Sequence, residues 1–360
     1  PNGQILPKRG KLAKKYREIF VAPPGYVLLE VDFSQMELRI AAIMAQDPTM
    51  LELYANGKDI HAATAAAVMG ISLDEFNNLD RDTRDHKRFL AKAVNFGFLY
   101  GMGWRKFITY ARTEYKLTFT EEEAQHIQQT FFYLYRRLKP WHNAMRRYVN
   151  EHGQVRAFSG RVRHLPSVYS PDEAIASGAE RQAINSPVQA FGSDLGLCAL
   201  ALLVKYVDFD LVRPIGFIHD ALVCIAPEDR AKEAAAEVKY WMEHIPTKKL
   251  FNWESEIPIV AEASVGKNLS KMVEITDEWF ADDNVINWHD IAHVDWVKRC
   301  EIAKERGEKR PAHPYIRANP HAPKPKRKLY KRLPHKRKIR IFKPRPAPTR
   351  VRVKRKVKLA

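Results

Sequence analysis

The sequence predicts an α/β fold of the α+β type, in which a few short strands and several longer helices share one globular body. Three observations lead to this prediction. Short apolar runs that fit buried strands lie far apart in the chain. The stretches between them have helical composition and amphipathic spacing. All acidic residues lie at or before Glu308, so the body is followed by a purely basic tail.

The positive charge of the chain is concentrated in this tail. The 360 residues include 60 Lys and Arg against 42 Asp and Glu, a formal net charge of +18. Residues 309–360 hold 21 of the basic residues and nine prolines, whereas residues 1–308 carry a net charge of −3. The tail lacks the apolar surface that would offset the entropy of ordering it, so we expect it to be disordered when unbound.

Several protein classes are excluded by composition. The three cysteines (Cys198, Cys224 and Cys300) are too few and too scattered for a disulfide framework, which favours a reducing, intracellular compartment. The absence of CxxC and HExxH patterns leaves no readable zinc site. Wholly apolar stretches such as residues 197–204 are too short to cross a bilayer, so no membrane partner is expected. No secretory signal opens the sequence.

Strands are predicted where apolar or alternating runs are bounded by turn residues. An irregular basic segment, residues 1–25, precedes the first of them. The predicted strands are residues 26–33, a hairpin over 155–166 that turns at Ser159–Gly160, then 215–218, 221–225 and 257–263.

Helices are predicted over residues 36–45, 59–70, 84–100, 121–150, 171–206 and 231–243, and within an extension at 276–308. Ser34 is expected to cap the first helix, with Glu37 completing a capping box. Pro140 is expected to break the helix of residues 121–150. Three tryptophans are expected to anchor the extension by packing: Trp279, Trp288 and Trp296.

Two aspartates follow or interrupt apolar strands, Asp32 after VLLEV and Asp220 within GFIHDALVCI. A carboxylate there is poorly solvated, and two such groups brought together would repel each other unless divalent cations joined them. Paired carboxylates holding Mg²⁺ or Mn²⁺ are the requirement of two-metal phosphoryl transfer. Considered singly, however, each Asp fits a turn residue or a helix cap better.

A second pattern lies on the helix predicted around residue 90. Arg84, Arg88 and Lys92 recur every four residues and are followed by Phe96 and Tyr100 at the same interval, so the five side chains form one slowly winding stripe. Cations followed by rings suit a nucleoside triphosphate, because cations bind phosphates and rings stack on bases. A solvated basic face that grades into a core contact explains the stripe equally well.

Around these residues the sequence resembles family A DNA polymerases, of the bacterial polymerase I and phage replicase type. VDFSQMELR (31–39) resembles motif A, RFLAKAVNFGFLYG (88–101) motif B and FIHDALV (217–223) motif C. Four more segments match the family in the same order: PNGQILP (1–7), DIHAATA (59–65), GRVRHLP (160–166) and ERQAINSPVQAFGSDL (180–195). The resemblance covers residues 1–273.

The resemblance implies the palm and fingers of a right-hand polymerase. An antiparallel-sheet palm would comprise residues 1–49 with motif A and residues 151–275 with the template-contact helix and motif C. Helical fingers would span residues 50–150, followed by the helical extension, 276–308, and the basic Pro-rich tail, 309–360. The implied reaction is template-directed extension of a primer 3′-hydroxyl with dNTPs, using two Mg²⁺ ions or Mn²⁺.

Roles for single residues follow from the same resemblance. Asp32 and Asp220, with the backbone carbonyl of Phe33, would bind the metal ions. Glu37 would be the steric gate against a 2′-hydroxyl, and a carboxylate there does discriminate by exclusion. Lys92 would protonate the leaving pyrophosphate, where a positive charge is most useful.

Other residues would bind the nucleotide and the duplex. Arg88 and Lys92 would bind the triphosphate, Phe96 would lie against the sugar, Tyr100 near the templating position and His61 near the incoming nucleotide. Contacts to the nascent pair or the primer-template minor groove, whose acceptors are nearly the same for every base pair, would come from Arg181, Asn185, Gln189 and His219.

The sequence departs from the family pattern in two ways. Motif C usually reads His-Asp-Glu, but Ala221 follows His219 and Asp220 here, and we expect activity to survive this change. The chain begins at Pro1 with no room for a thumb or a 3′–5′ exonuclease, so a second polypeptide is expected to supply both. The basic tail would bind nucleic acid, dock on an acidic protein partner or act as a targeting signal.

Two alternatives remain. A single-subunit RNA polymerase shares the palm plan, although Glu37 argues against it. A non-catalytic nucleic-acid-binding or assembly subunit with a polymerase fold is favoured slightly by Ala221 and by the missing thumb. The expected location is the host cytoplasm during phage replication.

Overall fold

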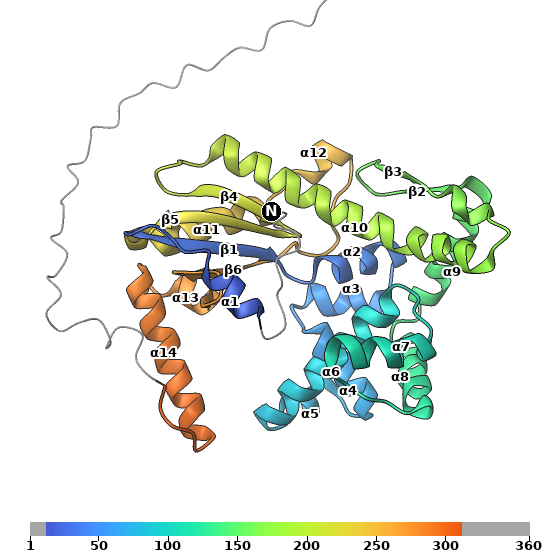
Figure 1. Cartoon of the computed structure of the whole chain (residues 1–360), viewed down its shortest axis with the longest axis horizontal. Helices are drawn as coiled ribbons and strands as arrows, with labels where there is room; N and C mark the ends of the chain where they lie inside the picture. The colour runs from blue at the N-terminus through green and yellow to red at the C-terminus, as the bar shows by residue number, and fades with distance from the viewer. Residues whose placement is uncertain (1–11, 312–360) are drawn as a thin grey trace, which may run out of the picture. The chain divides into compact units, whose positions relative to one another are not determined.

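The computed structural model describes residues 12–311 (Figure 1). The predictions made for residues 1–11 and for the tail from residue 312 onward lie outside the described residues. A five-stranded antiparallel sheet holds the strands in the order β4 (Arg213–Ile218), β5 (Ala221–Pro227), β1 (Tyr26–Phe33), β6 (Ala261–Gly266) and β7 (Met272–Ile275). The strand nearest the N-terminus therefore lies at the centre of the sheet.

The central strand β1 has one fully buried face. Val27, Leu29 and Val31 are 0% exposed, and they alternate with Glu30 and Asp32, which are partly exposed. Two helices pack on the sheet, α10 (Glu173–Tyr206) on β4 and β5 and α11 (Ala231–Glu243) on β1, β5 and β6. Successive side chains of a strand point to opposite faces, so Asp32 points away from this apolar layer.

The segment between β1 and the hairpin is helical throughout. Its elements are α2 (Met36–Ala45), α3 (Pro48–Ala55), α4 (Ile60–Met69), α5 (Leu73–Asn77), α6 (Arg81–Leu99), α7 (Trp104–Tyr110), a short π-helix (Ala111–Tyr115), α8 (Glu121–Leu134) and α9 (Leu138–His152). Most of them gather at one side of the view in Figure 1. Phe98 is fully buried between Phe107 and Phe131, at ring-centroid distances of 4.6 and 5.6 Å, so aromatic packing fixes α6 against α7 and α8.

The remaining elements complete the predicted order. They are α1 (Ala13–Glu18), the hairpin strands β2 (Gln154–Arg156) and β3 (Val162–His164), 3₁₀ turns at Pro166–Tyr169 and Glu228–Arg230, α12 (Thr247–Phe251), α13 (Asp277–Ala281) and α14 (Trp288–Glu305). Trp279 and Trp288 are buried, which confirms them as anchors of the extension. Trp296 is half-buried, and its Nε1 donates to the carbonyl of Pro311 at 3.1 Å.

The predicted capping box at Ser34 is wrong. Helix α2 begins at Met36, and its N-cap is Gln35, in the left-handed conformation with φ 55° and without a side-chain cap. The Ser34 hydroxyl donates instead to Glu262 Oε1 on β6, at 2.5 Å, and Glu37 accepts from the Tyr100 hydroxyl. Contacts across the sheet have replaced the local cap.

Two predicted boundaries are also wrong. The break in the 121–150 region falls at residues 135–137, and Pro140 lies in the first turn of α9, where its missing N–H is not needed. The last predicted strand begins at Ala261 rather than at residue 257. The residues before it include Pro258, which cannot donate to a ladder of strand hydrogen bonds.

Among the described residues, α10 is the one helix long and apolar enough to cross a membrane by length and composition. Its most apolar 18 residues have a mean hydropathy of 1.5, and half of them are buried inside the protein. This burial is typical of a core helix, and its contacts with the sheet explain the apolar composition.

We predict that Gly196→Ala destabilises the protein, because α10 approaches β4 closely at this point. A Cβ at Gly196 would lie 2.4 Å from the ring Cζ of Phe217, so the ring would have to move, at a cost of about 1–3 kcal/mol. The matched control is Gly178→Ala in the same helix, where the nearest atom, on Arg181, is 3.9 Å away and a gain of up to ~1 kcal/mol is expected. Denaturant unfolding measures both; equal effects would contradict the close approach.

Candidate active site

The two aspartates identified in the sequence meet on neighbouring strands. Asp32 is paired with Ala221 in the register of β1 and β5, and Asp220 directly precedes Ala221. Asp220 lies in the tight turn from β4 to β5, where His219 adopts φ 58°. Both aspartates line one cavity of about 380 Å³. Sheet pairing therefore brings together two carboxylates that are 188 residues apart in the sequence.

This first cavity has an acidic side and a basic side. Strands β1 and β6, the β4–β5 turn and the start of α2 supply the carboxylates, and α6 supplies Arg88, Lys92 and Phe96. The full lining is Asp32, Phe33, Ser34, Gln35, Met36, Glu37, His61, Arg88, Lys92, Phe96, Asp220 and Glu262. The structure thus brings together all predicted metal-binding and triphosphate-binding residues.

The cationic stripe of α6 is shorter than the sequence suggested. Arg84 lies on the same helix at the predicted spacing, but it donates to the backbone carbonyl of Asn77 and does not line the cavity. Arg88 donates to the carboxylate of Asp59, which also caps helix α4. The stripe that faces the carboxylates consequently begins at Arg88, in an orientation that Asp59 holds.

His61 lies beneath the basic side of the cavity and is 2% exposed. Its Nδ1 is 2.8 Å from Asn95 Nδ2, and its ring centroid is 6.1 Å from that of Phe96. The pKa of His61 is lowered to about 4, mainly by burial; the negative charge of Asp59 opposes this shift, and the positive charges of Arg88 and Lys92 add to it. The imidazole is neutral at physiological pH.

Glu37 lies at the start of α2 within a partly buried network. It accepts hydrogen bonds from Tyr100 and from Gln189. Burial raises the pKa of Glu37, and the nearby negative charge of Asp220 raises it as well. Burial and Glu37 together raise the pKa of Tyr100 well above its ordinary value. The side chain that would act as steric gate is therefore held from two directions.

A second, larger cavity of about 1030 Å³ shares Lys92 and Phe96 with the first. Tyr100, Arg181 and Asn185, which were predicted to face the template, line it. Three further basic residues line it, and none was predicted, because they lie outside the seven segments that match the family: Arg105, Lys106 and Arg146. The two cavities adjoin along the aromatic end of the stripe.

The other two residues predicted to contact the duplex, Gln189 and His219, do not line this second cavity. Gln189 lines a third cavity, of about 480 Å³, together with Arg161 and Arg163 of the hairpin. His219 is exposed in the β4–β5 turn. The Oδ1 atom of Asn185 is buried and has no hydrogen-bond partner within the described structure. An external donor would satisfy it.

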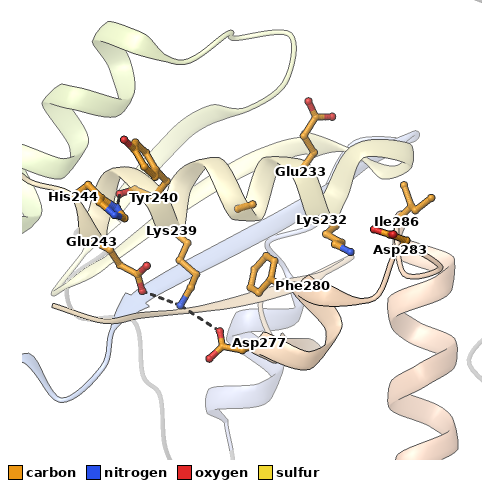
Figure 2. A pocket seen from close by; sticks show the side chains of 11 residues that line it. Lys232, Glu233, Lys239, Tyr240, Glu243, His244, Asp277, Phe280, Asp283 and Ile286 are labelled. Atoms are coloured by element: carbon orange, nitrogen blue, oxygen red, sulfur yellow. Dashed lines mark hydrogen bonds and ion pairs between the residues drawn. The ribbon is translucent and has the colours of Figure 1, made fainter. Parts of the chain in front are cut away.

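A further cavity, of about 730 Å³, lies between α11 and α13 (Figure 2) and shares no lining residue with the cavity of Asp32 and Asp220. Its charged groups bind one another, since Lys239 Nζ is 2.8 Å from Glu243 and 3.7 Å from Asp277. Lys232 Nζ donates to the backbone carbonyl of Asp282 at 2.6 Å. Because both lysines bind groups of the protein itself, we assign no catalytic role to this cavity.

Known proteins match this chain over the segments described above. The sequence model for DNA polymerase family A matches residues 1–271. The chain belongs to DNA polymerase family A. The family resemblance of the seven segments is thereby confirmed, and the extension from residue 276 lies beyond the matched region.

Curated relatives of this family A chain include bacterial and phage enzymes. It is 34% identical over 274 residues to the thermostable DNA polymerase I of Thermus filiformis, with 74% of this chain and 30% of the relative covered. It is 33% identical over 269 residues to DNA polymerase I of Deinococcus radiodurans, with 74% and 26% covered. For the DNA polymerase of Bacillus phage SP01 the values are 29% over 257 residues, with 71% and 27% covered. The chain spans less than a third of the length of these relatives.

A solved structure has the same fold. It is the POL domain of Pol1 from M. smegmatis in complex with DNA primer-template and dNTP, with a TM-score of 0.63 and 23% sequence identity. The match covers 75% of this chain and 45% of that chain. The predicted fold class, helices with an antiparallel sheet as in a right-hand polymerase, is confirmed.

We predict that His61→Gln flattens the pH dependence of stability. The pKa of His61 is about 4 in the folded state against an ordinary value of 6.5, so the unfolded state binds more protons between these pH values. The stability is complete above pH 6.5 and falls by an amount on the order of 3 kcal/mol as the pH drops toward 4. Unfolding free energies measured from pH 7 to pH 4 should show a smaller fall in the variant.

The control is His164→Gln, at an exposed histidine of β3. Its stability curve should run parallel to that of the wild-type protein. Parallel curves for His61→Gln would show that His61 is not buried as a neutral group.

Proposed function

We propose that this chain is the catalytic portion of a DNA-directed DNA polymerase that extends a primer 3′-hydroxyl with dNTPs and releases pyrophosphate. The observation that carries the proposal is the meeting of Asp32 and Asp220 at one cavity, opposite Arg88 and Lys92. Membership of family A and the DNA polymerase relatives support it. The Pol1 complex with primer-template and dNTP supports DNA and dNTP as ligands.

The residues of the cavity suit divalent cations. Asp32, Asp220 and the carbonyl of Phe33 offer hard oxygen ligands, which favour Mg²⁺ or Mn²⁺. Within the described residues no three His, Cys, Asp or Glu side chains form a ligand cluster, so the shell would be completed by backbone, water and substrate oxygens. When bound, two such ions supply activation of the 3′-hydroxyl and stabilisation of the leaving pyrophosphate.

The basic side of the cavity would hold the nucleotide. Arg88 and Lys92 would bind the triphosphate by charge-assisted hydrogen bonds, and Lys92 would donate a proton to the pyrophosphate as it leaves. Phe96 would lie against the sugar, and His61, neutral and bonded to Asn95, would form the floor near the incoming nucleotide. In this reaction the 3′-oxygen bonds to the α-phosphorus as the bond to the bridging oxygen breaks.

Glu37 would exclude the ribose 2′-hydroxyl. Its carboxylate is partly buried and accepts from Tyr100 and Gln189, so an added hydroxyl would displace these contacts or remain unpaired. Arg181, Asn185, Gln189 and His219 would contact the nascent pair and the duplex, and the unpartnered Oδ1 of Asn185 favours such a role.

A second polypeptide would add to the DNA-binding surface of this body. Residues 1–308 carry a net charge of −3, and DNA affinity depends mainly on neutralised phosphates, so this body alone would bind DNA weakly. The tail of residues 309–360, with 21 basic residues, would add affinity for nucleic acid or bind an acidic protein partner. The proposed place of action is the host cytoplasm during phage replication.

We predict that Asp32→Asn and Asp220→Asn each reduce primer extension by about 10³-fold or more, because each removes a carboxylate that would hold the divalent cations at the reacting phosphate. The assay uses the full chain with a primer-template and dNTPs, with and without fractions of its native complex. Asp210→Asn, at an exposed position before β4, is the matched control and should extend normally. Extension that is unchanged in both site variants would come from another chain of the complex. That result, or no extension by the wild-type chain under any condition, would favour a non-catalytic subunit.

Replacing Glu37 should relax sugar selection. We expect Glu37→Ala to reduce the preference for dNTPs over rNTPs by about 100-fold, since the group that excludes a hydroxyl is gone. Single-nucleotide incorporation with dATP and ATP measures the ratio. A wild-type chain that prefers rNTPs would instead support the RNA polymerase alternative.

Removing residues 309–360 should flatten the salt dependence of DNA binding. Each phosphate that the tail neutralises adds about −0.9 to the log–log slope of affinity against salt on duplex DNA. A chain with the tail's Lys and Arg changed to Gln keeps its length and should behave like the deletion. Slopes that match the wild type in both variants would assign the tail to another partner.

A further inference from the structure

The turn that joins β1 to α2 is held by three hydrogen bonds at Ser34. Its N–H donates to the carbonyl of Val260 at 2.8 Å, and its carbonyl accepts from Arg39 Nε at 2.9 Å. Its hydroxyl donates to Glu262 Oε1 at 2.5 Å. Arg39 also donates to the carbonyl of Pro258 at 2.9 Å. The turn is therefore fastened to β6 and to the segment before it.

Glu262 is placed beside the reacting groups as well as beside Ser34. It is the β6 partner of Asp32, on the side opposite Ala221, the β5 partner of Asp32. Of these two cross-strand neighbours only Glu262 carries a carboxylate, and it lines the same cavity as Asp32 and Asp220. A substitution at Glu262 therefore changes the immediate surroundings of Asp32 on the sheet.

The turn needs an external restraint. Gln35 has φ 55°, a conformation that costs free energy for a residue with a side chain, and α2 has no side-chain cap at this end. The Gln35 side chain accepts a hydrogen bond from the Tyr54 hydroxyl at 3.1 Å. Such backbone persists only where its surroundings fix it, and the bond from Ser34 to Glu262 joins two residues that line the cavity.

We propose that Glu262 is a positioning residue, which through the Ser34 hydroxyl fixes the turn between Asp32 and Glu37. It thereby sets the direction of the Phe33 carbonyl toward the metal site and of Glu37 toward the sugar. This inference rests on the proposed polymerase function. Glu262 acts as a hydrogen-bond acceptor in this role, and its negative charge is not required.

The test compares Glu262→Ala, Glu262→Gln, Ser34→Ala and the double variant Glu262→Ala/Ser34→Ala, with Glu274→Ala on the exposed edge of the same sheet as control. Mn²⁺ affinity by electron paramagnetic resonance, KM for dNTP, kcat and the dNTP/rNTP preference are measured for each. Thermal unfolding confirms that each variant is folded.

Glu262→Ala and Ser34→Ala are expected to weaken Mn²⁺ binding and to raise KM by about tenfold each, the effect of one hydrogen bond. Both should lower the sugar preference. The double variant should be no worse than either single one, because one contact is lost in all three. Glu262→Gln should retain wild-type values, since its amide oxygen accepts from Ser34.

Two results would overturn the proposal. Glu262→Gln behaving like Glu262→Ala, while Ser34→Ala stays normal, would show that the charge acts directly and not through the turn. Values equal to those of Glu274→Ala in all variants would show no role. Mn²⁺ affinity needs no turnover, so an inactive wild-type chain would refute the polymerase function while still testing the restraint on the turn.

Discussion

The pairing of β1 with β5 is the constraint on which the rest of the site depends. It sets Asp32 against Ala221 and so brings Asp220 beside a carboxylate that lies far away in the sequence. The apolar face of β1, with Val27, Leu29 and Val31 fully buried under helices, fixes this register, because a slip by one residue would move Asp32 into the core. Hydrophobic burial thus determines where the negative charge is placed.

The opposite side of the cavity is held by different means. Aromatic packing of Phe98 fixes α6, and Asp59, as the cap of α4, orients Arg88. Burial keeps His61 neutral, so that the cations beside it do not repel a third charge. Acidic groups from the sheet and basic groups from a helix meet across one cavity because each set is fixed by its own part of the core.

Much of this arrangement could be predicted from the sequence. The bounds of β1 and α11 agree with the apolar run at residues 26–33 and the helical pattern at 231–243, because buried elements carry strong periodic signals. Ser34 was misassigned since a local cap and a distant partner, Glu262, compete for one hydroxyl, and sequence spacing shows only the local one. Helical spacing places Arg84 in line with Arg88 but does not show that the cavity ends before Arg84, which donates to the carbonyl of Asn77.

The most direct measurement is the position of Mn²⁺ in crystals of the full chain, located by anomalous scattering. The carboxylates of Asp32 and Asp220 should both ligate manganese, and the density should be lost in crystals of the Asp220→Asn variant. Manganese bound at other residues, or retained at full occupancy after that substitution, would contradict the assignment of this cavity as the catalytic centre.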